Sequence, residues 1–121
     1  KYILTMDQDS SFREADITQH LMTSLQVMAD QSIAVVSPVF TSHVNLNVRT
    51  ELFEADSSIT SGSVLRLTAW QLVGGLKSKF FMDQIDHEFC IRLRREGYKV
   101  IVNPQAYMSH SIGNPITKIL R

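Results

Sequence analysis

Hydrophobic residues in this chain gather in short runs separated by polar turns, a pattern that favours an α/β protein. Residues 2–6 are apolar and β-prone and predict a buried, central strand, and residues 33–36 predict a second buried strand that stops at Ser37 and Pro38. Residues 98–102 predict a third strand, closed by a proline turn. Strands that alternate with helices predict an α/β fold with a mixed, partly parallel sheet flanked by helices.

Two longer segments and one short segment have helical signals. The first helix is predicted to begin at Asp16, which can cap the free amides together with Gln19. Its predicted sheet-facing residues are Ile17, Leu21, Leu25 and Met28. The second helix spans residues 83–96, carries arginines in its last turns and ends before Gly97. A short helix over residues 69–73 is expected to end at the glycine pair that follows it.

The remaining segments give weaker signals. Residues 43–49 alternate polar and apolar side chains, which predicts one half-exposed strand. Residues 59–67 look extended with an interruption at Ser61 and Gly62, and residues 106–111 form a short extended piece that carries a histidine. The tail over residues 116–121 is weakly amphipathic.

Composition narrows the function classes. The chain has 121 residues, enough for a single domain, and its 12 acidic and 12 basic residues cancel, so nucleic acid is not an expected partner. No apolar run approaches the ~20 residues of a membrane span. The one cysteine, Cys90, excludes an internal disulfide and fits a reducing compartment. We therefore expect a cytoplasmic protein, with the inner face of the membrane as an alternative setting.

The first candidate site is the Asp-x-Asp pair at the end of the first predicted strand. Alternate side chains of an extended chain point the same way, so Asp7 and Asp9 can face one site. Two close carboxylates repel unless a cation or a proton lies between them, and Mg²⁺ or Mn²⁺ would fit such oxygen ligands. The alternative interpretation is a polar turn that begins at Asp9 and Ser10.

The second candidate site is the acidic start of the helix over residues 83–96. Asp83, Asp86 and Glu88 follow an apolar Phe-Phe-Met run. The helix dipole alone accounts for Asp83, whereas a carboxylate beside apolar side chains can serve as a general base. Histidines elsewhere in the chain are interpreted as surface or satisfied core residues, and His110 differs because the segment after it can form a ligand-binding loop.

Taken in order, these motifs resemble family 2 glycosyltransferases with the GT-A fold, and most of all the rhamnosyltransferase branch. The segments that carry the resemblance are Asp7-Gln8-Asp9-Ser10, Thr60-Ser61-Gly62-Ser63, Gly74-Gly75-Leu76, Phe80-Phe81-Met82-Asp83, Asp86-His87-Glu88-Phe89-Cys90-Ile91-Arg92-Leu93 and Gly97-Tyr98-Lys99. The resemblance runs from the first residue to about Gly113 and is weakest over residues 39–58. Ile85 stands where the family motif usually has a glutamate, which weakens the accessory roles expected there.

The resemblance implies a role for each matched acidic residue and for the histidine. Asp9 would bind a divalent metal, Mg²⁺ or Mn²⁺, with His110 close to that metal or to the diphosphate. Asp7 would lie near the sugar or ribose. Asp86 would be the catalytic base, which takes a proton from an acceptor hydroxyl as it attacks the anomeric carbon with inversion.

Other matched residues would form the substrate pocket. Ser61 and Gly62 would line the donor-sugar and acceptor site. Glu88 would be the second acid and Arg92 its basic partner one turn on, a pair expected to form an ion pair that orients the helix. The implied partners are a nucleotide-sugar donor, with the thymidine diphosphate form of rhamnose as the candidate, and a polysaccharide or lipid-linked glycan acceptor.

The resemblance also predicts the domain content. The family's domain starts with strand–helix units that hold the nucleotide base, and none of these precedes Lys1. We therefore expect residues 1–121 to be one domain, the catalytic and acceptor half of a GT-A fold, inactive by itself. Its exposed sheet edge would invite formation of a homodimer.

Two other interpretations stay open from the residues. A strand that leads into Asp-x-Asp-x-Ser also resembles haloacid-dehalogenase-like phosphatases, with Asp7 as the nucleophile and Ser37 in the second motif. The later acidic pair of those enzymes has no clear counterpart here. The other alternative is a non-catalytic structural fragment.

Overall fold

The computed structural model describes residues 1–8, 10–40, 50–77 and 82–110, with their side chains except those of Phe40, Met82, Asp83 and His110. The elements, in chain order, are β1 (Tyr2–Leu4), β2 (Ser10–Phe12), α1 (Glu14–Val27), β3 (Ile33–Phe40), β4 (Phe53–Ala55), β5 (Val64–Arg66), α2 (Leu67–Val73), α3 (Met82–Arg95) and β6 (Lys99–His110). The strand predicted over residues 43–49 and the tail over residues 116–121 lie outside the described residues.

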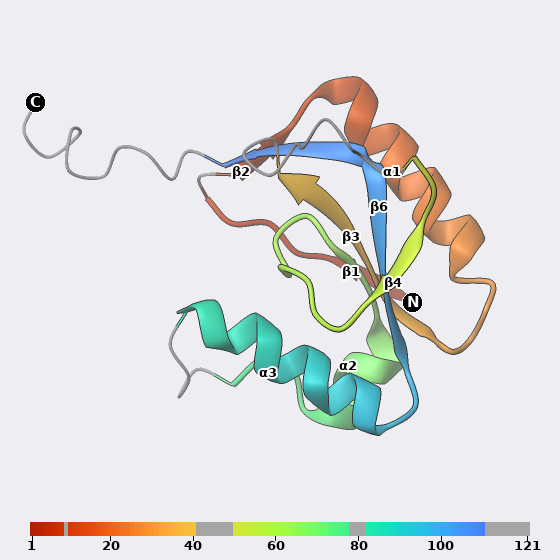
Figure 1. The fold of residues 1–121 in the computed structure, drawn as a ribbon, viewed down its shortest axis with the longest axis vertical. Helices are drawn as coiled ribbons and strands as arrows, with labels where there is room; N and C mark the ends of the chain where they lie inside the picture. Colours follow the sequence, from red (N-terminus) through yellow and green to blue (C-terminus); the bar gives the residue numbers. More distant parts are fainter. Residues whose placement is uncertain (9, 41–49, 78–81, 111–121) are drawn as a thin grey trace, which may run out of the picture.

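Six strands of the described chain form one mixed sheet. Their order is β1-β5-β3-β6-β2, and β4 also pairs with β6. The β3–β6 pair is parallel, and the other pairs are antiparallel. Figure 1 shows α1 on one side of the sheet and α2 and α3 on the other. The predicted α/β fold with a mixed sheet flanked by helices is confirmed and is consistent with a partial Rossmann-like fold.

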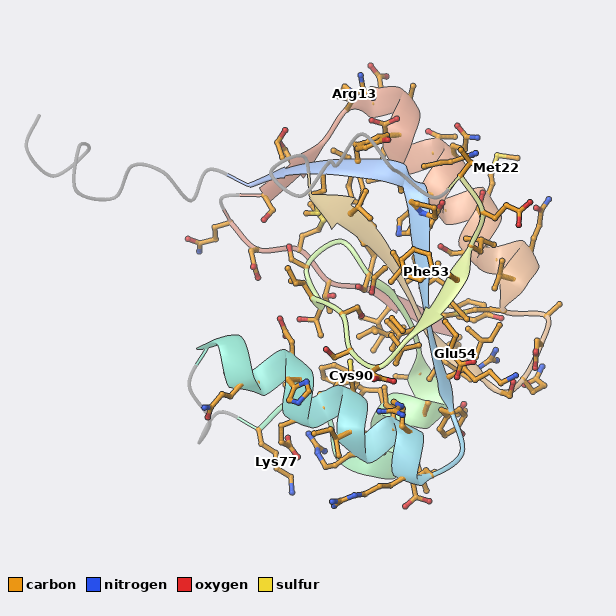
Figure 2. All side chains as sticks on the ribbon, viewed as in Figure 1. Arg13, Met22, Phe53, Glu54, Lys77 and Cys90 are labelled. Carbon is orange, nitrogen blue, oxygen red and sulfur yellow. The ribbon has the colours of Figure 1, made fainter. Side chains whose placement is uncertain are left out.

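Each face of the sheet has its own apolar core. The core beneath α2 and α3 consists of Ala34, Val35, Leu65, Ala69, Phe89, Cys90, Leu93 and Val100. The core beneath α1 consists of Met28, Ile33, Val36, Val64 and Ile101. Figure 2 shows Met22 on the outer side of α1, away from the sheet, in keeping with its 59% exposure. No helix of the described residues is long and apolar enough to cross a membrane.

The two central strands are longer than predicted. β3 continues through Pro38 to Phe40, and β6 continues through Asn103 and Pro104 to His110. Both prolines lie where the pairing is irregular: Ser37 is matched with Val102, but the next matched pair is Val39 with Tyr107. Proline is tolerated at such a bulge because a regular ladder bond is not needed there. The predicted strand ends at Pro38 and Pro104 were therefore wrong.

Helix α1 also differs from its prediction. It begins at Glu14 rather than Asp16, and its N-cap residue Arg13 makes no side-chain cap. The Asp16 carboxylate instead accepts a hydrogen bond from Arg13 Nε at 2.7 Å, so the predicted capping box is wrong. Leu25, predicted to face the sheet, is 51% exposed, whereas the polar residues His20 and Ser24 are fully buried.

Strand β1 is an edge of the described sheet rather than a central strand. It pairs with β5 alone among the described strands, and Ile3 packs against the core while Tyr2 and Leu4 are exposed. The expected burial of the whole apolar run was therefore wrong, because a strand alternates its faces and the face with Tyr2 and Leu4 is exposed. Dimer formation through this edge stays a prediction.

The two helices on the other face agree with the sequence. Helix α2 ends at Gly74, which has φ 81° in the left-handed region, as predicted. Helix α3 occupies nearly the predicted residues, its last turn carries three arginines, and Gly97 follows with φ 87°. The 3.6-residue spacing of its buried Phe89 and Leu93 explains why this helix could be predicted from sequence.

Candidate functional site

A short segment before β5, formed by Thr60, Ser61 and Gly62, contacts both acidic regions singled out from the sequence. The backbone N–H of Asp7 donates to Ser61 Oγ at 3.0 Å. The hydroxyl of Thr60 donates to Asp86 Oδ1 at 2.6 Å. The structure therefore brings Asp7 and Asp86 to two adjacent residues of one segment, although the two aspartates lie far apart in the sequence.

The end of β1 fixes the position of this segment. Thr5 donates its hydroxyl to the carbonyl oxygen of Thr60. The N–H of Gly62 donates to Thr5 O at 2.5 Å, and the N–H of Thr5 donates to Ser63 O at 3.2 Å. Because these bonds continue the β1–β5 pairing, the segment is tied to the strand that leads into Asp7. The carboxylate of Asp7 lies on an exposed residue just beyond that strand.

The predicted metal ligands are Asp9 and His110. Asp9 and the side chain of His110 lie outside the described residues. The backbone of β2 pairs Ser10 with His110, so the residue that follows Asp9 in the sequence lies opposite the predicted histidine. Among the described side chains, no group of three His, Cys, Asp or Glu residues could hold a metal. Metal binding by Asp9 and His110 stays a prediction.

The ion pair predicted between Glu88 and Arg92 is present. Arg92 Nε lies 2.5 Å from Glu88 Oε2. The same guanidinium donates to the carbonyl oxygen of Val73 and, at 2.7 Å, to that of Gly75. Arg92 therefore attaches the C-terminal end of α2 to α3, where the free carbonyls of a helix need donors.

Glu88 retains one carboxylate oxygen for another partner. Its Oε1 atom is buried and has no hydrogen-bond partner among the described residues. Substrate contacts of Glu88 and Arg92 stay predictions.

The buried histidine His20 supports the same segment from α1. Its Nε2 lies 2.9 Å from Gly62 O, and its Nδ1 lies 3.2 Å from the amide nitrogen of Asn103. The amide orientation is set by Asn103 Oδ1, which accepts the N–H of Gln105. The imidazole is therefore satisfied when it is neutral, with Nε2 as donor and Nδ1 as acceptor. The expectation of a satisfied core histidine is confirmed for His20, and His87 is exposed as expected.

We expect His20 to make the fold sensitive to acid. Burial lowers the pKa of His20 below its ordinary 6.5, although the bond to Gly62 opposes this shift. The unfolded chain then binds more protons than the folded chain below about pH 6.5, so stability falls as pH decreases, by at most about 1.4 kcal/mol per pH unit. The free energy of unfolding, measured with urea between about pH 5 and 7, should fall less steeply with decreasing pH in His20→Gln than in the wild type.

The matched control for this effect is His87→Gln. His87 is exposed on α3, so its replacement should leave the pH dependence of the free energy of unfolding unchanged. The same pH dependence of the free energy of unfolding in the wild type and in His20→Gln would contradict a neutral, buried His20.

Ser37 does not approach Asp7 through any contact in the described residues. Its hydroxyl lies 2.6 Å from Ser58 Oγ and 2.7 Å from Ser63 Oγ, and Ser37 is 1% exposed. A phosphatase would need this hydroxyl to face a phosphate. The contacts of Ser37 do not support the phosphatase interpretation.

Two residues of the site were not singled out from the sequence. Thr60 stands in the Thr-Ser-Gly motif, but its contact with Asp86 depends on the packing of α3 against the loop. Thr5 belongs to the strand before Asp7, and a threonine in a strand gives no signal of a tertiary hydrogen bond.

The site thus combines an exposed aspartate after a strand, a polar loop and an aspartate on a helix, all within an α/β fold. Over 67 residues the chain is 31% identical to the dTDP-rhamnosyl transferase RfbF of Shigella flexneri. The matched region covers 55% of this chain and 23% of that protein. No family model matches the chain, and no solved structure matches it. The similarity supports a distant, glycosyltransferase-like relationship.

Proposed function

We propose that this chain forms the catalytic and acceptor-binding part of a metal-dependent, inverting glycosyltransferase that uses a nucleotide-sugar donor. One observation carries the proposal: Thr60 and Ser61 bond to Asp86 and Asp7, so that one loop joins the two acidic parts expected of such a site. The similarity to a rhamnosyl transferase supports the same class. Rhamnose linked to thymidine diphosphate is the donor that we propose to test first.

Each residue has a role in this proposal. Asp86 accepts the proton of the acceptor hydroxyl as that oxygen attacks the anomeric carbon. Asp7 contacts the donor at the sugar or ribose, and Ser61 and Gly62 line the pocket. Glu88 contributes its unbonded oxygen, Oε1, toward a substrate hydroxyl.

The proposed metal fits the donor atoms that this sequence supplies. A carboxylate from Asp9 and an imidazole from His110 are ligands that suit Mn²⁺, and Mg²⁺ would rely on the carboxylate and on water. The pairing of Ser10, the residue after Asp9 in the sequence, with His110 supports this proposal. A bound divalent ion would neutralise the diphosphate leaving group.

The test is a donor screen on the full-length protein that contains this sequence. Release of nucleoside diphosphate is measured for several nucleotide-sugars, with Mn²⁺, with Mg²⁺ and after chelation. We expect turnover with one thymidine diphosphate sugar, and a loss of more than about tenfold after chelation, restored by added Mn²⁺. Absence of turnover with every nucleotide-sugar would overturn the proposed class, and turnover unaffected by chelation would overturn the metal.

A further inference from the structure

The contact between Thr60 and Asp86 has the features of a strong hydrogen bond. Its oxygen–oxygen distance of 2.6 Å is in the range of an O–H donor on a carboxylate, which is shorter and stronger than a bond between neutral groups. Thr60 is 8% exposed, so little water competes for its hydroxyl. Its donor atom is therefore committed to the carboxylate of Asp86.

The backbone of Thr60 is held through its carbonyl group. Its carbonyl oxygen accepts bonds from the hydroxyl of Thr5 and, at 3.0 Å, from the N–H of Ser63. The neighbouring Ser61 accepts the N–H of Asp7. Two adjacent residues of one segment therefore contact Asp7 and Asp86.

We propose that Thr60 is the positioning residue of the transfer reaction, which orients the Asp86 carboxylate and links it to the strand that carries Asp7. This inference rests on the proposed function. In the reaction, the acceptor hydroxyl gives its proton to Asp86, its oxygen bonds to the anomeric carbon, and the bond from that carbon to the diphosphate breaks, with its electron pair leaving on the nucleoside diphosphate. Thr60 gives up no proton in this step. It restricts the rotation of Asp86.

Other ionisable groups near the pair must be considered before pH is used as a test. Cys90 lies on the next turn of α3, and burial raises the pKa of its thiol above its ordinary 9.0, although a hydrogen bond to Ser58 opposes this shift; the charge of Asp86 adds to the rise. Cys90 therefore stays neutral in the acidic range. Figure 2 shows Cys90 on the side of α3 that faces the sheet. Asp7 bonds to the neighbouring Ser61 through its backbone N–H, His87 and Glu88 follow Asp86 on α3, and Arg94 lies two turns further along this helix.

The first test is the pH profile of kcat/KM in the full-length protein with Thr60→Val. A hydrogen bond donated to a carboxylate favours its charged form, so the loss of this bond should raise the pKa of Asp86. We expect the acidic limb of the profile to move to higher pH by about one unit. Thr60→Ser, which keeps the hydroxyl, should return the limb to the wild-type position.

The matched control is Ser63→Ala, which removes another buried hydroxyl from the same loop. Ser63 donates to Ile59 O at 2.7 Å and is not bonded to Asp86, so the limb should not move. An unmoved limb in Thr60→Val, or an equal movement in Ser63→Ala, would overturn the inference, because the hydroxyl would then have no specific effect on the base.

A second measurement does not depend on activity. The carboxyl carbon of Asp86 can be titrated by NMR in ¹³C-aspartate-labelled protein, with its signal assigned by its loss in Asp86→Asn. We expect a higher pKa for Asp86 in Thr60→Val than in the wild type. If no nucleotide-sugar is turned over, the proposed function fails, and this titration still decides whether Thr60 controls Asp86. If a nucleotide-sugar is turned over but Asp86 has the same pKa in the wild type and in Thr60→Val, the inference about Thr60 is overturned and the proposed function stands.

Discussion

Replacement of Asp86 by asparagine is expected to reduce kcat for sugar transfer by about 10²- to 10⁴-fold, the usual contribution of a general base. Asparagine has nearly the same shape, and its side-chain oxygen can still accept the hydroxyl of Thr60. The fold and the geometry of the loop should therefore be retained, while the group that takes the proton is lost. The measurement is the rate of nucleoside diphosphate release in the full-length protein at saturating donor and acceptor.

The control for this prediction is Asp56→Asn. Asp56 carries a carboxylate that is 87% exposed and lies 3.3 Å from Arg94, a surface pair of small energetic value. The loss of this carboxylate should change neither kcat nor the melting temperature appreciably. Near wild-type transfer by Asp86→Asn would exclude Asp86 as the base while leaving open a glycosyltransferase with another base.

The parts of the fold that local spacing determines were predicted well. Helix α3 has buried residues one turn apart and a glycine with positive φ after its end, and both signals lie within the segment itself. The ends of β3 and β6 were predicted wrongly because proline was treated as a local stop. In the structure Pro38 and Pro104 lie at a bulge between two paired strands, and that pairing joins segments far apart in sequence.

The buried face of α1 shows the same limit. His20 and Ser24 are polar and would be placed in solvent by hydrophobic periodicity. The partners of His20 come from other segments, because its ring bonds to Gly62 and Asn103, whereas the Ser24 hydroxyl bonds within α1 to the carbonyl of His20. Sequence spacing contains no information on partners that arrive from other elements.

The candidate site could also be predicted only as far as local motifs reach. Asp7 and Asp86 could be selected from sequence because each stands in a local motif. The resemblance placed Ser61 in the same pocket, but the hydrogen bonds of Ser61 and Thr60 to Asp7 and Asp86 could not be predicted, because they depend on how distant segments pack. The positions of Asp9 and of the His110 side chain lie outside the described residues.

The largest loss of stability is expected from Gly62→Ala. Gly62 has φ 75°, a left-handed conformation that costs an alanine about 1–2 kcal/mol. A Cβ atom there would also overlap Met108 Sδ and lie 2.9 Å from both Phe12 Cζ and Pro38 Cγ. Overpacking of this kind costs about 1–3 kcal/mol. The free energy of unfolding should therefore fall by about 3 kcal/mol or more, a large part of the ~5–15 kcal/mol of a typical domain.

Gly97→Ala separates the two causes, because Gly97 has φ 87° but open space where its Cβ would lie. In the same urea unfolding experiment, the free energy of unfolding of Gly97→Ala should fall only by the cost of a left-handed alanine, about 1–2 kcal/mol. Gly62→Ala should also lose transfer activity at temperatures where it is folded, because its neighbours Thr60 and Ser61 would be displaced from Asp86 and Asp7. Equal losses of stability in the two variants would mean that the packing around Gly62 yields, and that the loop is held less tightly than its contacts indicate.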